Sequence, residues 1–408
     1  MKEKHNKINR RNFLKTIGAA GVGSVLASAE TNAADPNAPT KTEESKLPQV
    51  PRQKLGKTGV EVSCLALGTM FNLVDNQIIL RKTLDWGVNY WDTAYSYARG
   101  NSELGIGKFL AKNPEVRKEL FIVSKASDAE TPDEIEKRLQ ASLKRMNTEY
   151  IDSYYGVHGL DDPEQLTNEL KQWTKDAKKR KLIRFFGFST HSNMAECLTA
   201  AAKLDWIDVI MTSYNFRLMQ KPELQAAIEA CYKAGVGLIA MKTQAKKIRT
   251  EDDKKLTEHF LKRGFTQGQA KIKAILADKR FSSACVGMKS IALLTENVAA
   301  VLDKTKLTQA DTKVFKEYAR ATCSGYCAGC GHICNSAMPD VPYVSDIMRH
   351  LMYYNSYGEH QEARELFAKI PGTVRGKLLS ANYSPAEARC PQHLPIGKLV
   401  AEAVGKLA

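Results

Sequence analysis

The chain has 408 residues, of which 43% are hydrophobic and 26% charged, and its formal net charge at pH 7 is +15. This length is sufficient for one large domain with a complete core and a second, smaller domain. The composition argues against a nucleic-acid-binding protein, because the basic residues are scattered through helix-like stretches such as 175–181 without interleaved aromatic residues. Beyond the N-terminal region no apolar run is long enough to span a membrane.

Residues 1–29 have the pattern of a twin-arginine export signal. Arg10 and Arg11 precede Phe-Leu-Lys, a Gly- and Ala-rich apolar run follows, and Ala27-Ser28-Ala29 forms a small-x-small cleavage site. An ordinary basic amphipathic tail is the alternative. The polar, Pro-rich residues 30–50 are expected to be a linker. The signal predicts a periplasmic or otherwise exported protein, the twin-arginine export machinery as a partner, and a cofactor inserted before export, because this route carries folded proteins.

From residue 52 onward, eight short apolar runs alternate with amphipathic helical stretches. The expected strands are 62–68, 88–94, 120–126, 151–159, 183–190, 207–214, 236–242 and 283–288. Nearly continuous apolar strands alternating with helices favour an α/β fold, a parallel sheet closed into a (β/α)8 TIM barrel. A doubly wound open sheet competes, but no G-x-G-x-x-G follows the first strand. We expect the barrel over 51–310 and a small, mostly α-helical cysteine-cluster domain over 311–408.

Polar residues follow the expected strands at their carboxyl ends, where a barrel places its active site. They are Asp92, Tyr97, Lys125 and His158. Carbonyl reduction by hydride needs a proton donor, and an ammonium such as Lys125 beside a phenol such as Tyr97 lowers the ordinary phenol pKa of about 10. A carboxylate keeps the lysine charged, and a neutral imidazole orients the carbonyl. The hydride must come from a nicotinamide, since no side chain supplies one.

These four residues, in this order, and the segment 52–70 (RQKLGKTGVEVSCLALGTM) resemble the aldo/keto reductase family over roughly residues 50–305. The resemblance implies that the four are the catalytic residues of an oxidoreductase that uses NADP(H) or NAD(H) on a small carbonyl or sugar substrate. It also implies a set of cofactor-binding residues: Gly68, Thr69, Asp92, Ser189, Lys289, Ser290, Glu296 and Asn297.

Three positions on the nucleotide side depart from the family pattern. Thr190 follows Ser189 where the family commonly has Asn, Met211 stands where it has an amide-binding Gln, and Leu293 stands where it has an Arg. These departures support a second hypothesis with another class of function. In this hypothesis the barrel has lost nicotinamide turnover and serves as an electron-transfer or binding module.

Five of the nine cysteines lie beyond the expected barrel, and the other four are isolated and expected to be small core residues. The spacing of the five resembles a ferredoxin-type site, in which the last ligand arrives from a distant Cys-Pro. We expect one 4Fe–4S cluster, with Cys323 as the substitute ligand. A structural zinc, disulfides and a radical-SAM centre are the alternatives. The expected ligands are Cys327, Cys330, Cys334 and Cys390. The cluster would relay electrons, with a redox partner protein, or stiffen its domain.

Overall fold

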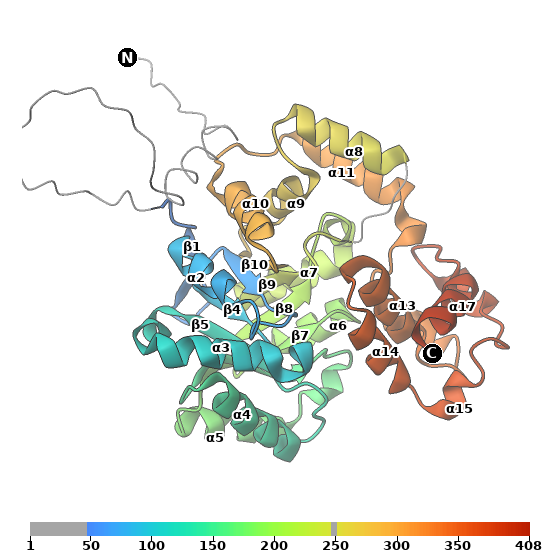
Figure 1. Ribbon diagram of the computed structural model, residues 1–408. Coiled ribbons are helices and arrows are strands. Elements are labelled where there is room, and N and C mark those ends of the chain that lie inside the picture. The colour runs from blue at the N-terminus through green and yellow to red at the C-terminus, as the bar shows by residue number, and fades with distance from the viewer. Residues whose placement is uncertain (1–46, 246–250) are drawn as a thin grey trace, which may run out of the picture. The chain divides into compact units, whose positions relative to one another are not determined.

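Eight parallel strands close into a barrel within residues 47–245 and 251–408, the residues that this computed structural model describes (Figure 1). The expected export signal and nearly all of the expected linker lie outside the described residues. The barrel closes because the last strand pairs with the first, which confirms the TIM-barrel prediction. The strands are β3 (Leu65–Gly68), β4 (Tyr90–Asp92), β5 (Phe121–Lys125), β6 (Ile151–His158), β7 (Ile183–Thr190), β8 (Val209–Ser213), β9 (Gly237–Met241) and β10 (Phe281–Gly287).

The first expected strand, 62–68, is divided in the structure. Its beginning is β2 (Glu61–Ser63), which pairs antiparallel with β1 (Arg52–Lys54), and only β3 enters the barrel. The break falls at Cys64, whose backbone N–H donates to the Pro51 carbonyl at 2.9 Å instead of joining a barrel strand. The hairpin buries Leu55 completely in the barrel core, so it closes the end of the barrel opposite the carboxyl ends of the strands.

Helices surround the barrel, and several of them begin at a residue whose side chain caps the helix. Thr131 caps α4: its hydroxyl accepts from the Glu134 backbone N–H at 3.3 Å, and the Glu134 carboxylate accepts from the Thr131 N–H at 3.1 Å. The barrel-region helices are α2 (Gln77–Asp85), α3 (Asn101–Lys112), α4 (Pro132–Met146), α5 (Asn168–Lys179), α6 (Met194–Ala201), α7 (Pro222–Lys233), α8 (Glu251–Lys262), α9 (Gln267–Leu276), α10 (Ile291–Leu302) and α11 (Gln309–Ala321). No helix of the described part combines the length and apolar character that crossing a bilayer requires.

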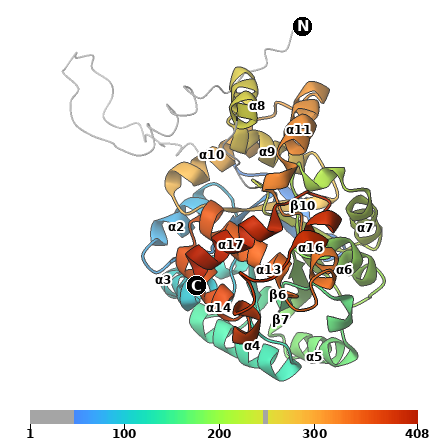
Figure 2. The same cartoon turned by 90° about the vertical axis from the view of Figure 1, so that its right-hand side faces the viewer.

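The residues after α11 form short helices with their own apolar core, which includes Ile347, Phe367 and Val400. In Figures 1 and 2 these helices, drawn in orange to red, lie across one end of the barrel. Lys369 forms an ion pair with Asp128 of the barrel at 2.7 Å. The helices are α12 (Gly331–Ser336), α13 (Val344–Met352), α14 (His360–Ala368), α15 (Gly372–Arg375), α16 (Ser384–Arg389) and α17 (Ile396–Leu407). We refer to residues 322–408 as the C-terminal segment.

Candidate active site at the carboxyl ends of the strands

Asp92 and Lys125 form a buried ion pair at the carboxyl ends of two neighbouring strands. Asp92 ends β4 and Lys125 ends β5, and the Lys125 Nζ lies 2.7 Å from Asp92 Oδ1 and 2.7 Å from the Thr93 carbonyl. The two side chains are only 3% and 1% exposed. Burial raises the pKa of Asp92, and the attraction of Lys125 opposes that rise. Each charge is therefore stabilised mainly by the other.

Tyr97 and His158 lie beside this ion pair. The Tyr97 ring centroid is 4.9 Å from Lys125 Nζ and 5.9 Å from the His158 ring, which it meets edge-on. Tyr97 opens a tight turn in which Ala98 has a φ of 49° and Arg99 a φ of 56°. Such strained backbone in non-glycine residues is concentrated at functional sites. The structure thus brings the four expected catalytic residues together.

Ser127 is a neighbour of His158 that the sequence analysis did not identify. Its hydroxyl lies 2.8 Å from His158 Nδ1 and also accepts from the Ser96 hydroxyl at 2.9 Å. A partner at Nδ1 fixes the ring orientation and leaves Nε2 for a ligand. The signal was available, because Ser127 follows the end of β5 by two residues, where a barrel places functional side chains.

The charge states differ from the sequence-based expectation at Tyr97. We expected Lys125 to lower the phenol pKa, but burial raises the pKa of Tyr97 well above its ordinary value, and the negative charge of Asp92 adds to the rise. Because Asp92 neutralises Lys125, the phenol faces an ion pair and not a lone cation. Burial also lowers the pKa of His158 to about 3, and Lys125 contributes to that shift. The site therefore presents a protonated phenol and a neutral imidazole, both of which can donate a hydrogen bond.

Several buried polar atoms at this end of the barrel have no hydrogen-bond partner among the described residues. They include Asp92 Oδ2, Ser189 Oγ, His191 Nε2 and Ser213 Oγ. Buried polar groups in native proteins are almost always paired, so unpaired atoms that converge on one region indicate a ligand site. Ser189 is the second-last residue of β7, and its unpaired hydroxyl fits the expected role in cofactor binding. Met211 is buried in the barrel core and offers no such hydrogen bond.

Of two other expected cofactor residues, Gly68 ends the first barrel strand and Thr69 follows it directly. Gly68 pairs with Asp92 in the sheet, and a Cβ there would lie 3.2 Å from the Cys285 Sγ, so the position is closely packed. The Thr69 hydroxyl is 2.8 Å from the Asp92 carbonyl and 2.6 Å from Ser102 Oγ. Its hydroxyl therefore holds β3, β4 and α3 together, a structural role that leaves only its backbone for a ligand.

Of the remaining expected cofactor residues, Lys289 and Ser290 lie at the start of α10, and Glu296 and Asn297 lie in its middle. Ser290 caps this helix by accepting from the Leu293 backbone N–H at 3.3 Å, and Lys289 precedes it. Glu296 accepts from the Thr266 hydroxyl at 2.6 Å, and Asn297 is buried. Ser290 and Glu296 thus already have partners within the protein, while the helix N-terminus itself remains suited to an anion.

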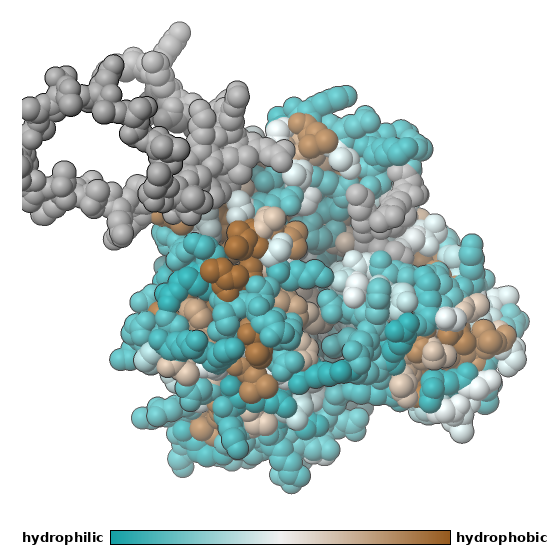
Figure 3. Space-filling model, viewed as in Figure 1, coloured by the Kyte–Doolittle hydropathy of each residue, from teal (hydrophilic) through white to brown (hydrophobic). Residues whose placement is uncertain are grey.

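Leu293 lies exposed beside this helix start, where the family commonly has a charged side chain. It is 38% exposed, and Ile291 and Ile78 nearby are also exposed. Figure 3 shows apolar atoms, in brown, gathered over α2 and the start of α10. An apolar surface here offers a phosphate no direct ionic partner. Nucleotide binding at this place would therefore depend on Lys289 and on the N-terminus of α10.

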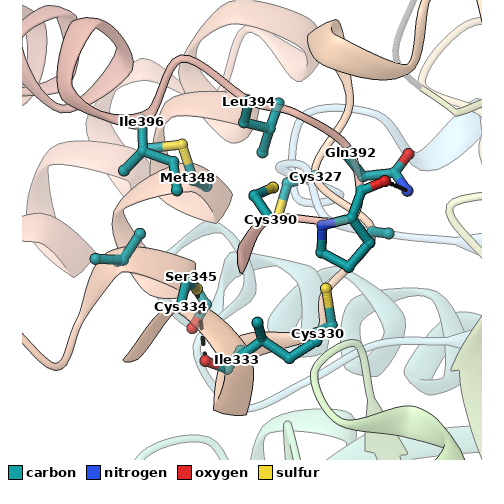
Figure 4. A pocket seen from close by; sticks show the side chains of 14 residues that line it. Cys327, Cys330, Ile333, Cys334, Ser345, Met348, Cys390, Gln392, Leu394 and Ile396 are labelled. Carbon is teal, nitrogen blue, oxygen red and sulfur yellow. Dashed lines mark hydrogen bonds between the residues drawn. The ribbon is translucent and has the colours of Figure 1, made fainter. Parts of the chain in front are cut away.

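Four of the five C-terminal cysteines surround one cavity (Figure 4). Cys327 and Cys330 come from the loop before α12, Cys334 from α12 and Cys390 from the end of α16, whereas Cys323 is not among the residues that line the cavity. All nine cysteines are free thiols. Burial raises the pKa of Cys327 to about 11. The described residues contain no group of three or more His, Cys, Asp or Glu arranged to hold a metal ion.

The C-terminal segment also influences Tyr97, which the sequence analysis did not predict. Tyr353 and Glu362 of this segment contribute electrostatically to the raised pKa of Tyr97. Gly329 lies between Cys327 and Cys330, in the loop before α12 that we call the cysteine loop. It has a φ of 79°, and a Cβ there would lie 2.1 Å from the His191 carbonyl oxygen. Only glycine permits this close docking of the cysteine loop on the barrel.

His350 provides a prediction about stability. It is 4% exposed, its Nδ1 has no partner among the described residues, and burial lowers its pKa from 6.5 to about 3. Below pH 6.5 His350 binds a proton in the unfolded chain but not in the folded protein. The free energy of unfolding therefore falls as the pH drops from about 6.5 toward 3. We expect His350→Gln to remove about 1.4 kcal/mol of this loss per pH unit. Urea unfolding of both proteins at pH 7 and pH 5 checks this; parallel losses would contradict it.

Comparisons with known proteins agree with this architecture. The model of the aldo/keto reductase family matches residues 65–319. Aldo-keto reductase yakc, NADP(+), of Schizosaccharomyces pombe is 30% identical over 212 residues, 47% of this chain and 60% of that protein. Aldo-keto reductase AFTS1 of Alternaria alternata is 26% identical over 233 residues, 46% of this chain and 63% of that protein. The chain thus spans less than two thirds of the length of these relatives.

Two solved structures cover a larger share of this chain than these relatives do. The thermostable aldo-keto reductase Tm1743, in complex with the inhibitor epalrestat, is 25% identical with a TM-score of 0.56, covering 66% of this chain and 99% of that one. The aldo-keto reductase AKR11C1 from Bacillus halodurans, in its holo form, is 20% identical with a TM-score of 0.55, covering 66% of this chain and 96% of that one, and shows the shared fold. With the family match over most of the barrel, this chain belongs to the aldo/keto reductase family.

Proposed function

We propose that this protein is an oxidoreductase that transfers a hydride between NADP(H) or NAD(H) and a small carbonyl or sugar substrate. The observation that carries the proposal is the buried Asp92–Lys125 ion pair, with the Tyr97 phenol and the His158 imidazole beside it at the carboxyl ends of the strands. NADP(H) is the preferred choice, because the S. pombe relative bears NADP(+) in its name.

The roles of the side chains follow from their charge states. The bound nicotinamide would supply or accept the hydride, and Ser189, with its unpaired hydroxyl, would hold the carboxamide. Tyr97 keeps its proton at neutral pH and donates it to the carbonyl oxygen as negative charge develops there. Lys125 stabilises the phenolate that remains, and neutral His158 donates a second hydrogen bond to the same oxygen.

Calorimetric titration with NADPH tests the proposal against the second hypothesis. Met211 and the exposed Leu293 weaken the expected nucleotide site and favour a barrel that serves only in electron transfer or binding. Saturable binding that weakens when Ser189 is replaced by Ala supports hydride transfer. No binding at millimolar cofactor would favour the second hypothesis.

We also propose that Cys327, Cys330, Cys334 and Cys390 hold one 4Fe–4S cluster. Support comes from their positions around one cavity, with apolar side chains of Ile333, Leu394 and Ile396 completing its wall. Thiolate ligands in an apolar, water-poor surrounding suit such a cluster. A structural zinc bound by the same thiolates is the alternative.

An anaerobic absorption spectrum before and after dithionite checks the cluster. We expect a broad visible band that bleaches on reduction and about four irons per chain. Cys330→Ser should lose the band, because it removes a ligand that lines the cavity, while the matched variant Cys323→Ser should keep it. A colourless protein containing zinc would contradict the proposal, and so would equal losses in the two variants.

We further propose that the protein is exported through the twin-arginine machinery and works in the periplasm with a redox partner protein. The pattern of residues 1–29 supports this, together with a cofactor inserted before export. Fractionation of cells that make the full chain, with and without Arg10→Lys and Arg11→Lys, checks the location.

A further inference from the structure

Ser127 holds a fixed position beside the His158 imidazole. Its backbone N–H donates to the Lys125 carbonyl at 3.0 Å, and its own carbonyl accepts from Arg138 Nε at 3.3 Å. Ser127 is 3% exposed, and its hydroxyl lies 2.8 Å from His158 Nδ1. A hydroxyl on a backbone that is anchored on both sides keeps its place relative to the ring, as a residue that orients another residue must.

Ser96 supplies two donors to the same hydroxyl. The Ser96 hydroxyl donates to Ser127 Oγ at 2.9 Å, and the Ser96 backbone N–H donates to it at 3.4 Å. Ser96 directly precedes Tyr97, and on its other side the Tyr95 backbone N–H donates to the Lys125 carbonyl at 3.1 Å. The loop that carries Tyr97 is therefore hydrogen-bonded to the chain around Ser127.

These contacts determine where the Ser127 proton points. A serine hydroxyl has one proton to donate and two lone pairs that accept. The two Ser96 donors occupy both lone pairs, so the proton is directed to His158 Nδ1, and no other acceptor for it lies among the described residues. If Nδ1 carried the ring proton, three donors would meet at one oxygen and the Ser127 proton would have no acceptor. Leaving a buried polar group unpaired in this way costs stability.

The tautomer of His158 follows from the direction of this hydrogen bond. Burial lowers the pKa of His158 to about 3, so the ring is neutral, with one nitrogen that donates and one that accepts. Because Nδ1 accepts from Ser127, the ring proton is on Nε2, which has no hydrogen-bond partner among the described residues. The Nε2–H group is thus available to a substrate oxygen. The opposite tautomer would present a lone pair there and repel the negative charge that develops during reduction.

We propose that Ser127 and Ser96 are positioning residues that select the Nε2–H tautomer of His158. The inference rests on the proposed function for its consequence, because this tautomer is the one that can donate to the carbonyl oxygen during hydride transfer. The chain of hydrogen bonds runs from Ser96 through Ser127 to His158, and it begins one residue before Tyr97. One loop therefore carries the phenol and, through two hydroxyls, orients the imidazole N–H.

Nitrogen NMR of the full chain, made with isotopically labelled histidine, reads the tautomer directly. The protonated and the bare nitrogen of a neutral imidazole resonate in separate ranges, and the His158 signals are identified by their absence in His158→Gln. The wild type should show a protonated Nε2 and a bare Nδ1. In Ser96→Ala, and more strongly in Ser127→Ala, the two shifts should move toward each other as both tautomers become populated.

Ser153→Ala is the matched control. It removes a buried hydroxyl from the strand that carries His158, and this hydroxyl has no partner among the described residues, so the His158 shifts should not change. A wild-type protein with the proton on Nδ1 would overturn the proposal, and so would unchanged His158 shifts in either Ser127→Ala or Ser96→Ala. The Ser96 variant is the sharper of the two, because Ser96 acts on His158 only through Ser127.

Aldehyde reduction measures the consequence for catalysis. Ser127→Ala should lower kcat about tenfold with little change in KM, because the hydrogen bond from Nε2 strengthens only as charge develops on the oxygen. Ser127→Thr keeps a hydroxyl and should restore most of the rate together with the wild-type tautomer. An unchanged kcat in Ser127→Ala would overturn the role of the tautomer in catalysis. The expected tautomer in a wild-type protein that reduces no aldehyde would mean that the proposed function fails alone.

Discussion

Replacing Tyr97 with Phe is expected to lower kcat/KM for aldehyde reduction by roughly a hundred- to ten-thousand-fold. The Tyr97 ring centroid lies 4.9 Å from Lys125 Nζ, and the raised pKa of its phenol keeps it protonated across the physiological range. Phe preserves the ring that packs edge-on against His158, so the substitution removes the phenolic hydroxyl and keeps the ring contact. Steady-state kinetics with NADPH, supported by calorimetry that shows unchanged cofactor affinity, measures the loss.

Tyr95 provides the matched control for this experiment. It lies two residues away, but its hydroxyl accepts from Arg138 at 3.2 Å and its ring lies against Arg138 and Arg145. We expect Tyr95→Phe to retain activity within a few-fold, because its phenol is already bound on the helix side. Turnover that survives in Tyr97→Phe and is lost in Tyr95→Phe would reassign the proton donor.

The second large effect concerns the ion pair itself. Lys125→Met should lower the free energy of unfolding by about 3–5 kcal/mol, because it leaves the Asp92 carboxylate buried without its counter-charge. Asp92 is 2% exposed and its Oδ2 already lacks a partner, so water cannot replace the ammonium. Urea unfolding measures the loss, and aldehyde reduction by this variant should fall as well.

Two comparisons make this result specific. The double variant Asp92→Asn/Lys125→Met should be more stable than Lys125→Met alone, since no unpaired charge remains. Lys369→Met removes a pair in which both side chains are 53% exposed, and it should change stability by less than about 1 kcal/mol. Similar losses in Lys125→Met and Lys369→Met would show that burial does not determine the strength of the pair.

The barrel was predictable because its signals are local. Seven of the eight expected strands contain an observed one, and the eighth, 283–288, overlaps β10, which begins two residues earlier. Apolar β-branched runs and helix periodicity are encoded within short windows. The division of the first strand at Cys64 was not predictable. It depends on the hydrogen bond from Cys64 to Pro51, which forms only when the hairpin folds against the end of the barrel.

The convergence of the expected catalytic residues was predictable for a similar reason, and their environment was not. Asp92, Lys125 and His158 end neighbouring strands, so their convergence follows from the topology. The raised pKa of Tyr97 depends on burial and on Tyr353, more than two hundred residues away in the chain.

The cysteine spacing indicated which thiols would converge. Four of the five C-terminal cysteines line one cavity, and Cys323 is not among the residues that line it. Spacing alone did not reveal that the cysteine loop rests on the barrel through Gly329. That docking depends on contacts between distant parts of the chain, and Cys327 lines both the cavity of the four cysteines and a second cavity that His191 also lines.

The most direct test of hydride transfer follows the hydride itself. The protein is incubated with para-carboxybenzaldehyde and NADPH that carries deuterium at the hydride position of the nicotinamide, and the alcohol is examined by mass spectrometry. The proposed chemistry predicts one deuterium on the carbinol carbon of the product, with loss of the product in Tyr97→Phe. An alcohol that contains only protium, or no alcohol from the wild-type protein, would contradict it.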